Sequence, residues 1–408
     1  MNSMILKEKL REIVKSQRIE LSLFEKGIER EELKEIDVNI PFALVLSGIR
    51  RCGKSTLLRQ LMSKTKNFYY FNFEDPRIVN FEVNDFNKLD EIFMEEYNNQ
   101  NYYFFDEIQN VDKWEIFVRS LLDKQKKVII TGSNASLLSK ELGTKLTGRH
   151  LRYELFPFSY KEFLKLNKED PNIKSFEKYF VNGGFPEYLK LKRPEILREL
   201  FSDIVIRDIV LRHKIRNIKT IQEIALYLIT NVGKEYSYNN LKKMFNLGST
   251  NSVISFVSYL EDSYLLFSIP KFDYSLRKQL VNPKKVYSVD NGLSNINSSS
   301  FSEDKGKMLE NLVFVNLRRK YKNIFYFQER GECDFVIKEG TKITRAIQVC
   351  YNLNEDNKER EINGIKSALR KFDLKEGVIL TDDIDDNFTI DNKKIKVIPV
   401  WKWLTQFN

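Results

Sequence analysis

Cysteine and histidine are scarce in this chain of 408 residues. It has three cysteines, Cys52, Cys333 and Cys350, and two histidines, His150 and His213. Three cysteines form no disulfide framework, and no pair of them has the spacing of zinc ligands. Two histidines leave little material for a His-rich metal site or a Ser-His-Asp triad. The counts fit a reducing compartment, and we expect the protein to be cytoplasmic.

Long apolar runs and an excess of acidic residues are also missing. No stretch approaches the roughly 20 apolar residues of a membrane span, and the N-terminal MNSMILKEKLREIVKSQRIE is too charged for a secretory signal. We therefore expect no membrane contact. The chain has 67 Lys and Arg against 57 Asp and Glu, a net charge of +10. This surplus favours an anionic partner such as nucleic acid, although a charge-rich solvated surface would also produce it.

The length predicts two to four domains. The pattern of apolar and polar residues divides the chain into six segments: a helical N-terminal segment (1–36), an α/β domain (37–160), a helical lid or connector (161–219), a region of short helices and a hairpin (220–290), a Ser- and Asn-rich linker (291–303) and a second α/β domain (304–408).

The first α/β domain alternates buried-type strands with helices. Such alternation predicts a parallel sheet with helices on both faces. The expected strands are residues 41–48, 68–73, 101–105, 127–131 and 151–160.

A glycine-rich loop follows the first of these strands. The segment from Gly48 to Ser55 reads GIRRCGKS and fits the phosphate-loop pattern G-x-x-x-x-G-K-[ST] between a strand and a helix. Gly48 and Gly53 let backbone N–H groups surround phosphate oxygens, at a helix N-terminus that favours anions. Lys54 would reach the β- and γ-phosphates, and Ser55 would offer its hydroxyl to Mg²⁺. We add Thr56 to this nucleotide-binding set; the alternative is an accidental glycine turn.

Two acids end the third strand. In NYYFFDE, Asp106 is predicted to hold the Mg²⁺ shell, and Glu107 to polarise the attacking water as a general base. The strand at 68–73 intervenes in the chain and indicates that the phosphate loop and the acidic pair end non-adjacent strands. The alternative is an acidic pair on an ordinary turn.

Two further polar positions could touch the γ-phosphate. Asn134, and with slightly less support Ser133, follows the next strand in VIITGSN. Arg149, in the sequence TGR, could stabilise developing charge in its own subunit or across a subunit interface. A surface arginine before a strand explains Arg149 equally well.

Residues 220–290 have the outline of a winged helix-turn-helix, with three short helices and a hairpin. We expect polar side chains on the third helix and basic side chains on the wing to contact DNA. Proteins of this outline also serve as protein-binding or lid modules. The predicted contacts are Thr250, Asn251, Ser252 and Ser255 on the helix, and Lys271, Arg277, Lys278, Lys284 and Lys285 on the wing.

Several of these motifs together resemble the AAA-type ATPases of archaea and bacteria that join a P-loop domain to a winged helix and a restriction-endonuclease-like C-terminal domain. The resemblance covers most of the chain. It implies an α/β P-loop NTPase with a parallel sheet, ATP binding and hydrolysis, and a nucleotide-sensing role for Arg149. The motifs that carry it are SGIRRCGKSTLLRQL, YFFDEIQNVDKWE, ITGSNASLL, LTGRHLRYELFPFSYKEF and NGGFPEYL.

The last domain resembles the restriction-endonuclease core, in which carboxylates hold Mg²⁺ and a lysine activates water. The resemblance implies metal ligands at Glu310, Asp334 and Gln348. Glu332 lies two residues before Asp334, on the same face of the strand, and could add a ligand. The sequence departs from the pattern because Gln348 replaces an acid and Cys350 replaces the lysine. A substitute lysine could come from nearby, at 338 or 342. The alternative is a nuclease fold kept for binding or assembly.

Three functions follow from these patterns. The first is an ATPase acting on or near DNA, which could form a homo-oligomer. The second is a nucleotide-gated switch that binds a protein partner. The third is a Mg²⁺-dependent DNA nuclease.

Overall fold

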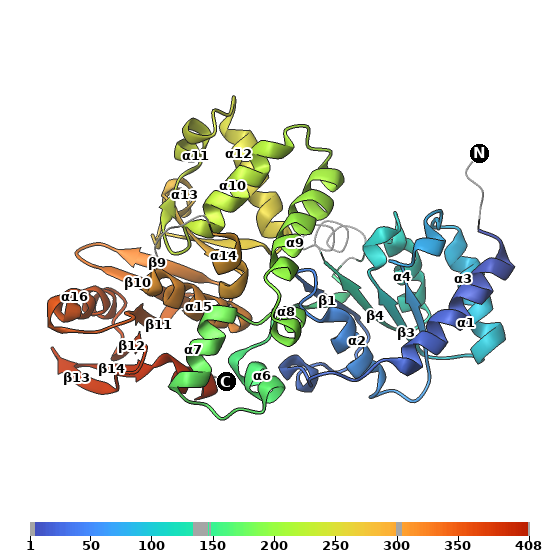
Figure 1. Ribbon diagram of the computed structural model, residues 1–408, viewed down its shortest axis with the longest axis horizontal. Helices are drawn as coiled ribbons and strands as arrows, with labels where there is room; N and C mark the ends of the chain where they lie inside the picture. The colour runs from blue at the N-terminus through green and yellow to red at the C-terminus, as the bar shows by residue number, and fades with distance from the viewer. Residues whose placement is uncertain (1–4, 134–145, 147, 299–303, 407–408) are drawn as a thin grey trace. The chain divides into compact units, whose positions relative to one another are not determined.

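The computed structural model describes residues 5–133, 146, 148–298 and 304–406. Backbone packing divides the chain into two compact units, Met1–Leu155 and Phe156–Asn408, which are described separately (Figure 1).

The first unit is built on a five-stranded sheet. The strand order is β2-β3-β4-β1-β5, and every neighbouring pair is parallel. The strand that ends in the phosphate loop therefore lies at an interior position, and all five strands end at the same edge of the sheet. The strands are β1 (Ala43–Gly48), β2 (Phe68–Asn72), β3 (Tyr102–Asp106), β4 (Lys127–Gly132) and β5 (His150–Leu155).

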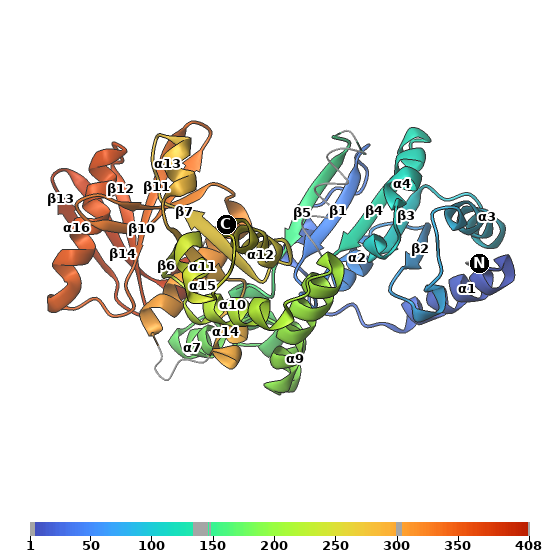
Figure 2. The ribbon, with the colours of Figure 1, turned by 90° about the horizontal axis from the view of Figure 1, so that it is seen from above.

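Helices cover both faces of this sheet, as the alternating pattern predicts (Figure 2). On one face, α1, α3 and α4 bury an aromatic-rich core against alternate strand residues such as Val45, Phe71 and Phe105. The residues between them point to the other face, where α2 packs against β1, β3 and β4. The helices are α1 (Lys7–Leu23), α2 (Lys54–Met62), α3 (Asp85–Tyr97) and α4 (Trp114–Asp123), with short 3₁₀ turns η1 (Glu31–Lys34), η2 (Pro76–Ile78) and η3 (Ile108–Asn110).

Three details differ from the sequence expectations. The helix expected over residues 1–36 ends at Leu23, and it packs on α3 and β2 as part of the first unit. The strand expected over 151–160 ends at Leu155, because Ser159 forms the capping box that begins α6. The phosphate-loop and acidic strands are non-adjacent, as predicted, but β4 separates them and the strand at 68–72 lies at the sheet edge.

The second unit begins with helices. Within this run, residues 204–211 form a π-helix, η4 (Ile204–Leu211), in which Ile204, Val205 and Ile209 are buried. The others are α6 (Tyr160–Asn167), α7 (Ile173–Asn182), α8 (Pro186–Leu191), α9 (Glu195–Asp203) and α10 (Ile218–Thr230).

A small antiparallel sheet of order β6-β8-β7 follows, with β8 in the centre. Helix α12 turns Val253, Val257 and Leu260 inward. The elements are β6 (Glu235–Tyr236), α11 (Tyr238–Met244), α12 (Thr250–Asp262), β7 (Leu266–Pro270), α13 (Leu276–Val281) and β8 (Lys284–Ser288).

The segment 291–303, predicted to be a linker, contains a buried helix, α14 (Asn291–Asn297). The prediction is wrong for this part because Asp290 caps the helix by accepting from Leu293 N–H, and because Leu293 is fully buried among α7, α9 and α10. The polar composition of this segment does not indicate a buried helix, because the burial depends on helices that are distant in the sequence.

The C-terminal part of the second unit is a six-stranded mixed sheet of order β13-β14-β12-β11-β10-β9. Helix α16 packs on β10, β11 and β12, and α15 contacts β8 and β11. The elements are α15 (Lys305–Lys320), β9 (Ile324–Gln328), β10 (Glu332–Glu339), β11 (Lys342–Val349), α16 (Glu355–Lys371), β12 (Glu376–Thr381), β13 (Asp386–Ile390), β14 (Lys393–Pro399) and α17 (Val400–Gln406). No helix in the described ranges is long and apolar enough to cross a bilayer.

Candidate functional site

The phosphate loop joins the end of β1 to the start of α2, and two of its positions require glycine. Gly48 has φ +152°, and a Cβ there would lie 2.1 Å from the Leu155 carbonyl oxygen of β5. Gly53 has φ +102° and directly precedes α2. Side chains at these positions would be strained or would collide, so the loop conformation depends on both glycines.

Lys54 is buried at the start of α2, with 4% of its surface exposed. Its Nζ donates to the carbonyl oxygens of Gly48 and Ile49, each at 3.2 Å, and lies 3.6 Å from Glu107 Oε1. The ammonium is thus held at the strand end beside the acidic pair. Ser55 and Thr56 follow in the first turn, where free N–H groups and the helix dipole favour a phosphate.

Asp106 ends β3 and is 4% exposed. Thr131 Oγ1 on β4 donates to its Oδ1 at 2.5 Å, and the Ser55 hydroxyl also donates to its carboxylate. Burial, reinforced by the charge of Glu107, raises the pKa of Asp106 to about 6. Asp106 and Ser55 therefore meet as two hard oxygen donors, which fits the Mg²⁺ predicted for them.

Glu107 occupies a turn with φ +50°. Its backbone N–H donates to Thr131 Oγ1 at 2.8 Å, and Gln109 donates to its carboxylate. Burial acts to raise the pKa of Glu107, but Lys54, the Gln109 bond and Arg50 outweigh it and lower the pKa. The carboxylate is therefore ionised at neutral pH, as a general base requires.

Thr131 is a site residue that the sequence analysis missed. Its hydroxyl accepts from the N–H of Glu107 and donates to Asp106, so one side chain on β4 positions both acids. The sequence gives a single trace of this role, a hydroxyl at the end of the apolar run VIIT. Pairing between β3 and β4 had to be known before that trace could be interpreted.

Arg30 is a second residue that the sequence analysis missed. It is fully buried, and its Nη1 donates to the carbonyl oxygen of Cys52 at 2.7 Å. The Arg30 N–H donates to Gln60 Oε1 on α2 at 3.1 Å. A buried guanidinium from the segment before β1 therefore supports the phosphate loop from within the unit.

Ser133 follows β4, beside the phosphate loop, because its neighbour Gly132 pairs with Ser47 of β1. It is 1% exposed, and its Oγ has no hydrogen-bond partner in the described part of the chain. A buried hydroxyl without a partner is costly, so this position suits a ligand that supplies one. Asn134, the other candidate, lies outside the described residues.

Arg149 lies at the opposite end of the sheet from the phosphate loop. Ala43 pairs with His150 and Gly48 pairs with Leu155, so five strand residues, about 17 Å, separate the two ends. Arg149 Nη2 instead bonds Asp123 Oδ1 at 2.9 Å. The register thus places Arg149 far from the phosphate loop of its own chain, and a role across a subunit interface and that of a surface arginine both stay open.

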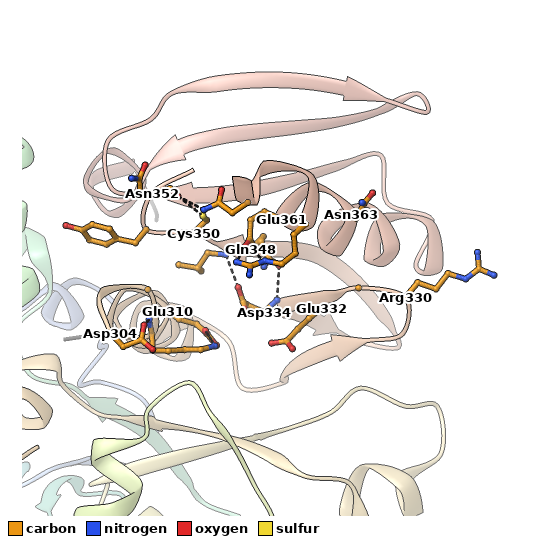
Figure 3. A pocket seen from close by; sticks show the side chains of 17 residues that line it. Asp304, Glu310, Arg330, Glu332, Asp334, Gln348, Cys350, Asn352, Glu361 and Asn363 are labelled. Carbon is orange, nitrogen blue, oxygen red and sulfur yellow. Dashed lines mark hydrogen bonds and ion pairs between the residues drawn. The ribbon is translucent and has the colours of Figure 1, made fainter. Parts of the chain in front are cut away.

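The residues predicted as C-terminal metal ligands do meet, in a cavity of about 670 Å³ between α15, β10, β11 and α16 (Figure 3). Glu310, Asp334 and Gln348 all line it. The Asp334 N–H donates to Gln348 Oε1 at 3.2 Å, and Gln348 Nε2 donates to Glu361 Oε2 at 2.7 Å. Glu361, on α16, was missed because helix α16 carried no recognised motif.

A lysine from another sheet occupies the centre of these acids. Lys285 Nζ on β8 lies 3.0 Å from Glu310 Oε1, 2.6 Å from Glu332 Oε1 and 3.1 Å from Asp334 Oδ1. Lys285 is 2% exposed, so its predicted role as a phosphate contact on the wing is wrong. Burial acts to lower the pKa of Lys285, but attraction to Tyr287 and the acids raises it well above its ordinary value.

The cavity does not fit Mg²⁺ through the predicted ligands. Within the described ranges, no three His, Cys, Asp or Glu side chains form a metal-binding group. Burial raises the pKa of Asp334 to about 6 and that of Cys350 to about 12, so the thiol supplies no charge. The two suggested replacement lysines, at 338 and 342, are absent from the residues that line the cavity.

Three family models match the chain in succession. Residues 41–164 match an AAA domain. Residues 173–304 match a domain of unknown function (DUF8612), and residues 305–403 match another (DUF4143). The AAA match contains the phosphate loop, the acidic pair, Ser133 and Arg149.

Similar full-length proteins occur in archaea and bacteria. An uncharacterized protein of Methanocaldococcus jannaschii, MJ1544, is 38% identical over 98% of this chain and 96% of its own length. An uncharacterized protein of Haemophilus influenzae is 30% identical over 90% of this chain and 94% of its own.

Two solved structures are similar to parts of this chain. DnaA from Aquifex aeolicus, bound to AMPPCP, is 13% identical and covers 57% of this chain and 85% of its own, with a TM-score of 0.27. A DNA polymerase III γ subunit-related protein from Thermotoga maritima is 14% identical and covers 76% of this chain and all of its own, with a TM-score of 0.25. At these TM-scores the likeness identifies no function.

Proposed function

The chain belongs to the same family as the M. jannaschii protein MJ1544, and from the site in its AAA domain we propose that it binds ATP and hydrolyses the bond to the γ-phosphate. The observation that carries the proposal is the convergence of Lys54, Asp106 and Glu107 at one edge of the sheet, with Thr131 fixing both acids.

Each residue has a defined part in this reaction. Backbone N–H groups of the loop and of α2 bind the phosphates, and Lys54 neutralises their charge. Asp106 and Ser55 would hold Mg²⁺, which supplies further charge neutralisation when bound. Glu107 accepts a proton from the attacking water, and the lowered pKa of Glu107 keeps it ready to do so. Ser133 offers a hydroxyl to the γ-phosphate.

The test is ATP turnover by the full-length chain. Lys54→Ala should remove nucleotide binding, whereas Glu107→Gln should keep binding and lose turnover by at least 100-fold, the usual contribution of a general base. Gly248→Ala, at an open position of the second unit, serves as the control. Wild-type turnover no higher than that of the two variants would refute hydrolysis, and retained nucleotide binding by Glu107→Gln would then leave a binding protein.

Arg149 acts, in this proposal, on ATP bound by a second copy of the chain. The support is the strand register, which keeps Arg149 from its own phosphate loop, together with the half-exposed position of its side chain. The proposal therefore requires a homo-oligomer. Mixing inactive Lys54→Ala with inactive Arg149→Ala chains tests it, because mixed interfaces can unite an intact loop with an intact arginine. Arg149→Ala chains that keep full turnover alone would contradict the role.

DNA is the proposed partner of the second unit. The order helix, strand, helix, helix, strand, helix, strand over α10 to β8 supports the winged-helix prediction, with α13 inserted between the last two strands, and the order of α15 to β12 supports a restriction-endonuclease-like fold for the last domain. Asn251 on α12 and Lys243 on α11 are exposed and available for phosphate contact. Turnover measured with single-stranded, duplex and branched DNA tests the partner. Stimulation by any of them supports DNA, and its absence supports the second candidate.

That second candidate is a nucleotide-gated switch that binds a protein. One observation favours it: α13 and the residue before its cap expose large apolar side chains, with 77% of Tyr274, 68% of Leu276 and 76% of Val281 accessible. Contiguous exposed apolar residues are typical of protein interfaces. Slow turnover that DNA leaves unchanged, with a conformational change on ATP binding, is the expected signature.

A further inference from the structure

The acidic cluster beside the C-terminal cavity already contains a cation. The ammonium of Lys285 lies within 3.1 Å of carboxylate oxygens on Glu310, Glu332 and Asp334. These acids come from α15 and β10, whereas the lysine comes from β8 of the small sheet. Carboxylate oxygens are also the ligands that a hard divalent cation takes, and here the ammonium holds the position between them.

We propose that Lys285 is the resident cation of this cluster, that it excludes a divalent metal ion from the cavity of the native chain, and that its removal exposes a site for Mg²⁺ or Mn²⁺. The native C-terminal domain then has no metal-dependent nuclease activity. The carboxylates of the nuclease-like pattern instead join the small sheet to the large one.

The oxygens of the cluster are already committed. Glu310 accepts from Tyr287 at 2.6 Å through Oε1 and from Lys307 at 2.7 Å through Oε2. Asp334 Oδ2 accepts from the Val349 N–H at 3.0 Å. Each carboxylate oxygen can accept a second bond, and in the native chain the Lys285 ammonium takes that position on Glu310 Oε1 and Asp334 Oδ1, where Mg²⁺ would need its short ligand bonds of about 2.1 Å.

The positive charge of Lys285 also opposes binding of a divalent ion in the cluster. The three carboxylates carry three negative charges, and Lys285 and Lys307 carry two positive charges, so the cluster has a net charge of −1 with Lys285 and −2 without it. A divalent ion placed among the same oxygens would lie beside the buried ammonium, and like charges in a poorly solvated site repel strongly.

The backbone of Lys285 is fixed by the small sheet. It sits on the central strand of the small sheet, paired with Glu235 of β6 and Ile269 of β7. Tyr287, two residues along the strand and on the same face, also bonds Glu310. Strand pairing therefore fixes the point from which the side chain reaches the cluster, and the three carboxylates hold the ammonium itself.

Mn²⁺ binding, measured by electron paramagnetic resonance without nucleotide, tests the proposal. All chains carry Asp106→Asn, which removes the metal ligand of the ATP site. We expect no saturable Mn²⁺ in the chain with native Lys285, and one Mn²⁺ per chain after Lys285→Met. Adding Asp334→Asn should abolish the gained site. Lys284→Met, on the neighbouring residue that bonds Tyr238, is the matched control and should gain nothing.

Thermal unfolding gives a second readout. Lys285→Met should unfold at a lower temperature than the native chain, and millimolar Mn²⁺ should restore several degrees to this variant while leaving the Lys284→Met control unchanged. If Lys285→Met does not fold alone, pairing it with Glu310→Gln lowers the charge of the cluster; Mn²⁺ binding gained by the folded double variant then supports the proposal, and a folded double variant that binds no Mn²⁺ counts against it.

Two results would overturn it. The first is that the chain with native Lys285 binds Mn²⁺ saturably and loses this binding with Asp334→Asn, because the metal would then have displaced the lysine. The second is a folded Lys285→Met chain that gains neither Mn²⁺ binding nor metal-dependent stability, because the cluster would then be no cation site.

Discussion

Replacing Asp106 with asparagine should stabilise the first unit while abolishing ATP turnover. The carboxyl group of Asp106 has its pKa raised from 3.8 to about 6 by burial and by Glu107. A raised carboxyl pKa means that the folded state binds the proton more tightly than the unfolded state. Ionised Asp106 therefore costs stability at neutral pH, and the cost fades as the pH falls from about 6 towards 3.8.

The size of the effect follows from the shift. About two pKa units correspond to roughly 3 kcal/mol, at about 1.4 kcal/mol per unit. Asparagine carries no charge, and its Oδ1 can still accept from Thr131, so Asp106→Asn should recover most of that cost. For a unit of this size, roughly 3 kcal/mol corresponds to a rise of about 6–12 °C in the midpoint of unfolding.

Hydrogen exchange measured on peptides from β3 and β4 reports the stability of the first unit separately from that of the rest of the chain. We expect slower exchange in Asp106→Asn than in the native chain at pH 7.5, with the difference shrinking below pH 5 after correction for intrinsic exchange rates. The control is Asp90→Asn, which changes a carboxylate on α3 that accepts a hydrogen bond from the Tyr103 hydroxyl of β3. A gain that is equal at both pH values, or no gain, would refute the assigned cost of ionised Asp106.

Two further predictions concern the same site. Thr131→Val should raise the pKa of Asp106 by about one further unit, because the hydrogen bond that is lost favours the ionised carboxylate. The acidic limb of the pH profile of kcat/KM, measured at subsaturating Mg²⁺, should move to higher pH by that amount, whereas Thr131→Ser should leave it in place. An unmoved limb in Thr131→Val would contradict the role of Thr131 as hydrogen-bond partner of both acids. Gly48→Ala should weaken nucleotide binding at least tenfold, because the new Cβ would lie 2.1 Å from the Leu155 carbonyl oxygen. Equilibrium binding of a fluorescent ATP analogue measures the affinity, with Gly248→Ala as control. Unchanged affinity would show that the loop adapts to the added Cβ.

Local motifs explain which parts of the first site were predictable. The phosphate loop and the acidic pair each depend on a short run of residues at a strand end, so their spacing survives without tertiary information. Thr131 and Arg30 depend on β4 pairing with β3 and on a distant segment packing beneath the loop. No local pattern identifies either of them.

Arg149 illustrates a different limit. Its motif was recognised, but the motif is compatible with action in either subunit. Only the parallel pairing of β5 with β1, from His150 at one end to Leu155 at the other, separates Arg149 from its own phosphate loop. Register is a property of two strands together, and neither strand specifies it alone.

The amino-acid sequence by itself determined that this chain has a phosphate loop and a strand-end acidic pair, because each signal lies within a few consecutive residues. Tertiary structure alone decided what the carboxylates of the last domain do. Glu310 and Asp334 lie beside Lys285, which is 25 and 49 residues away in the chain. The charge of a buried acid depends on which cation packs against it, and that neighbour is chosen by the fold.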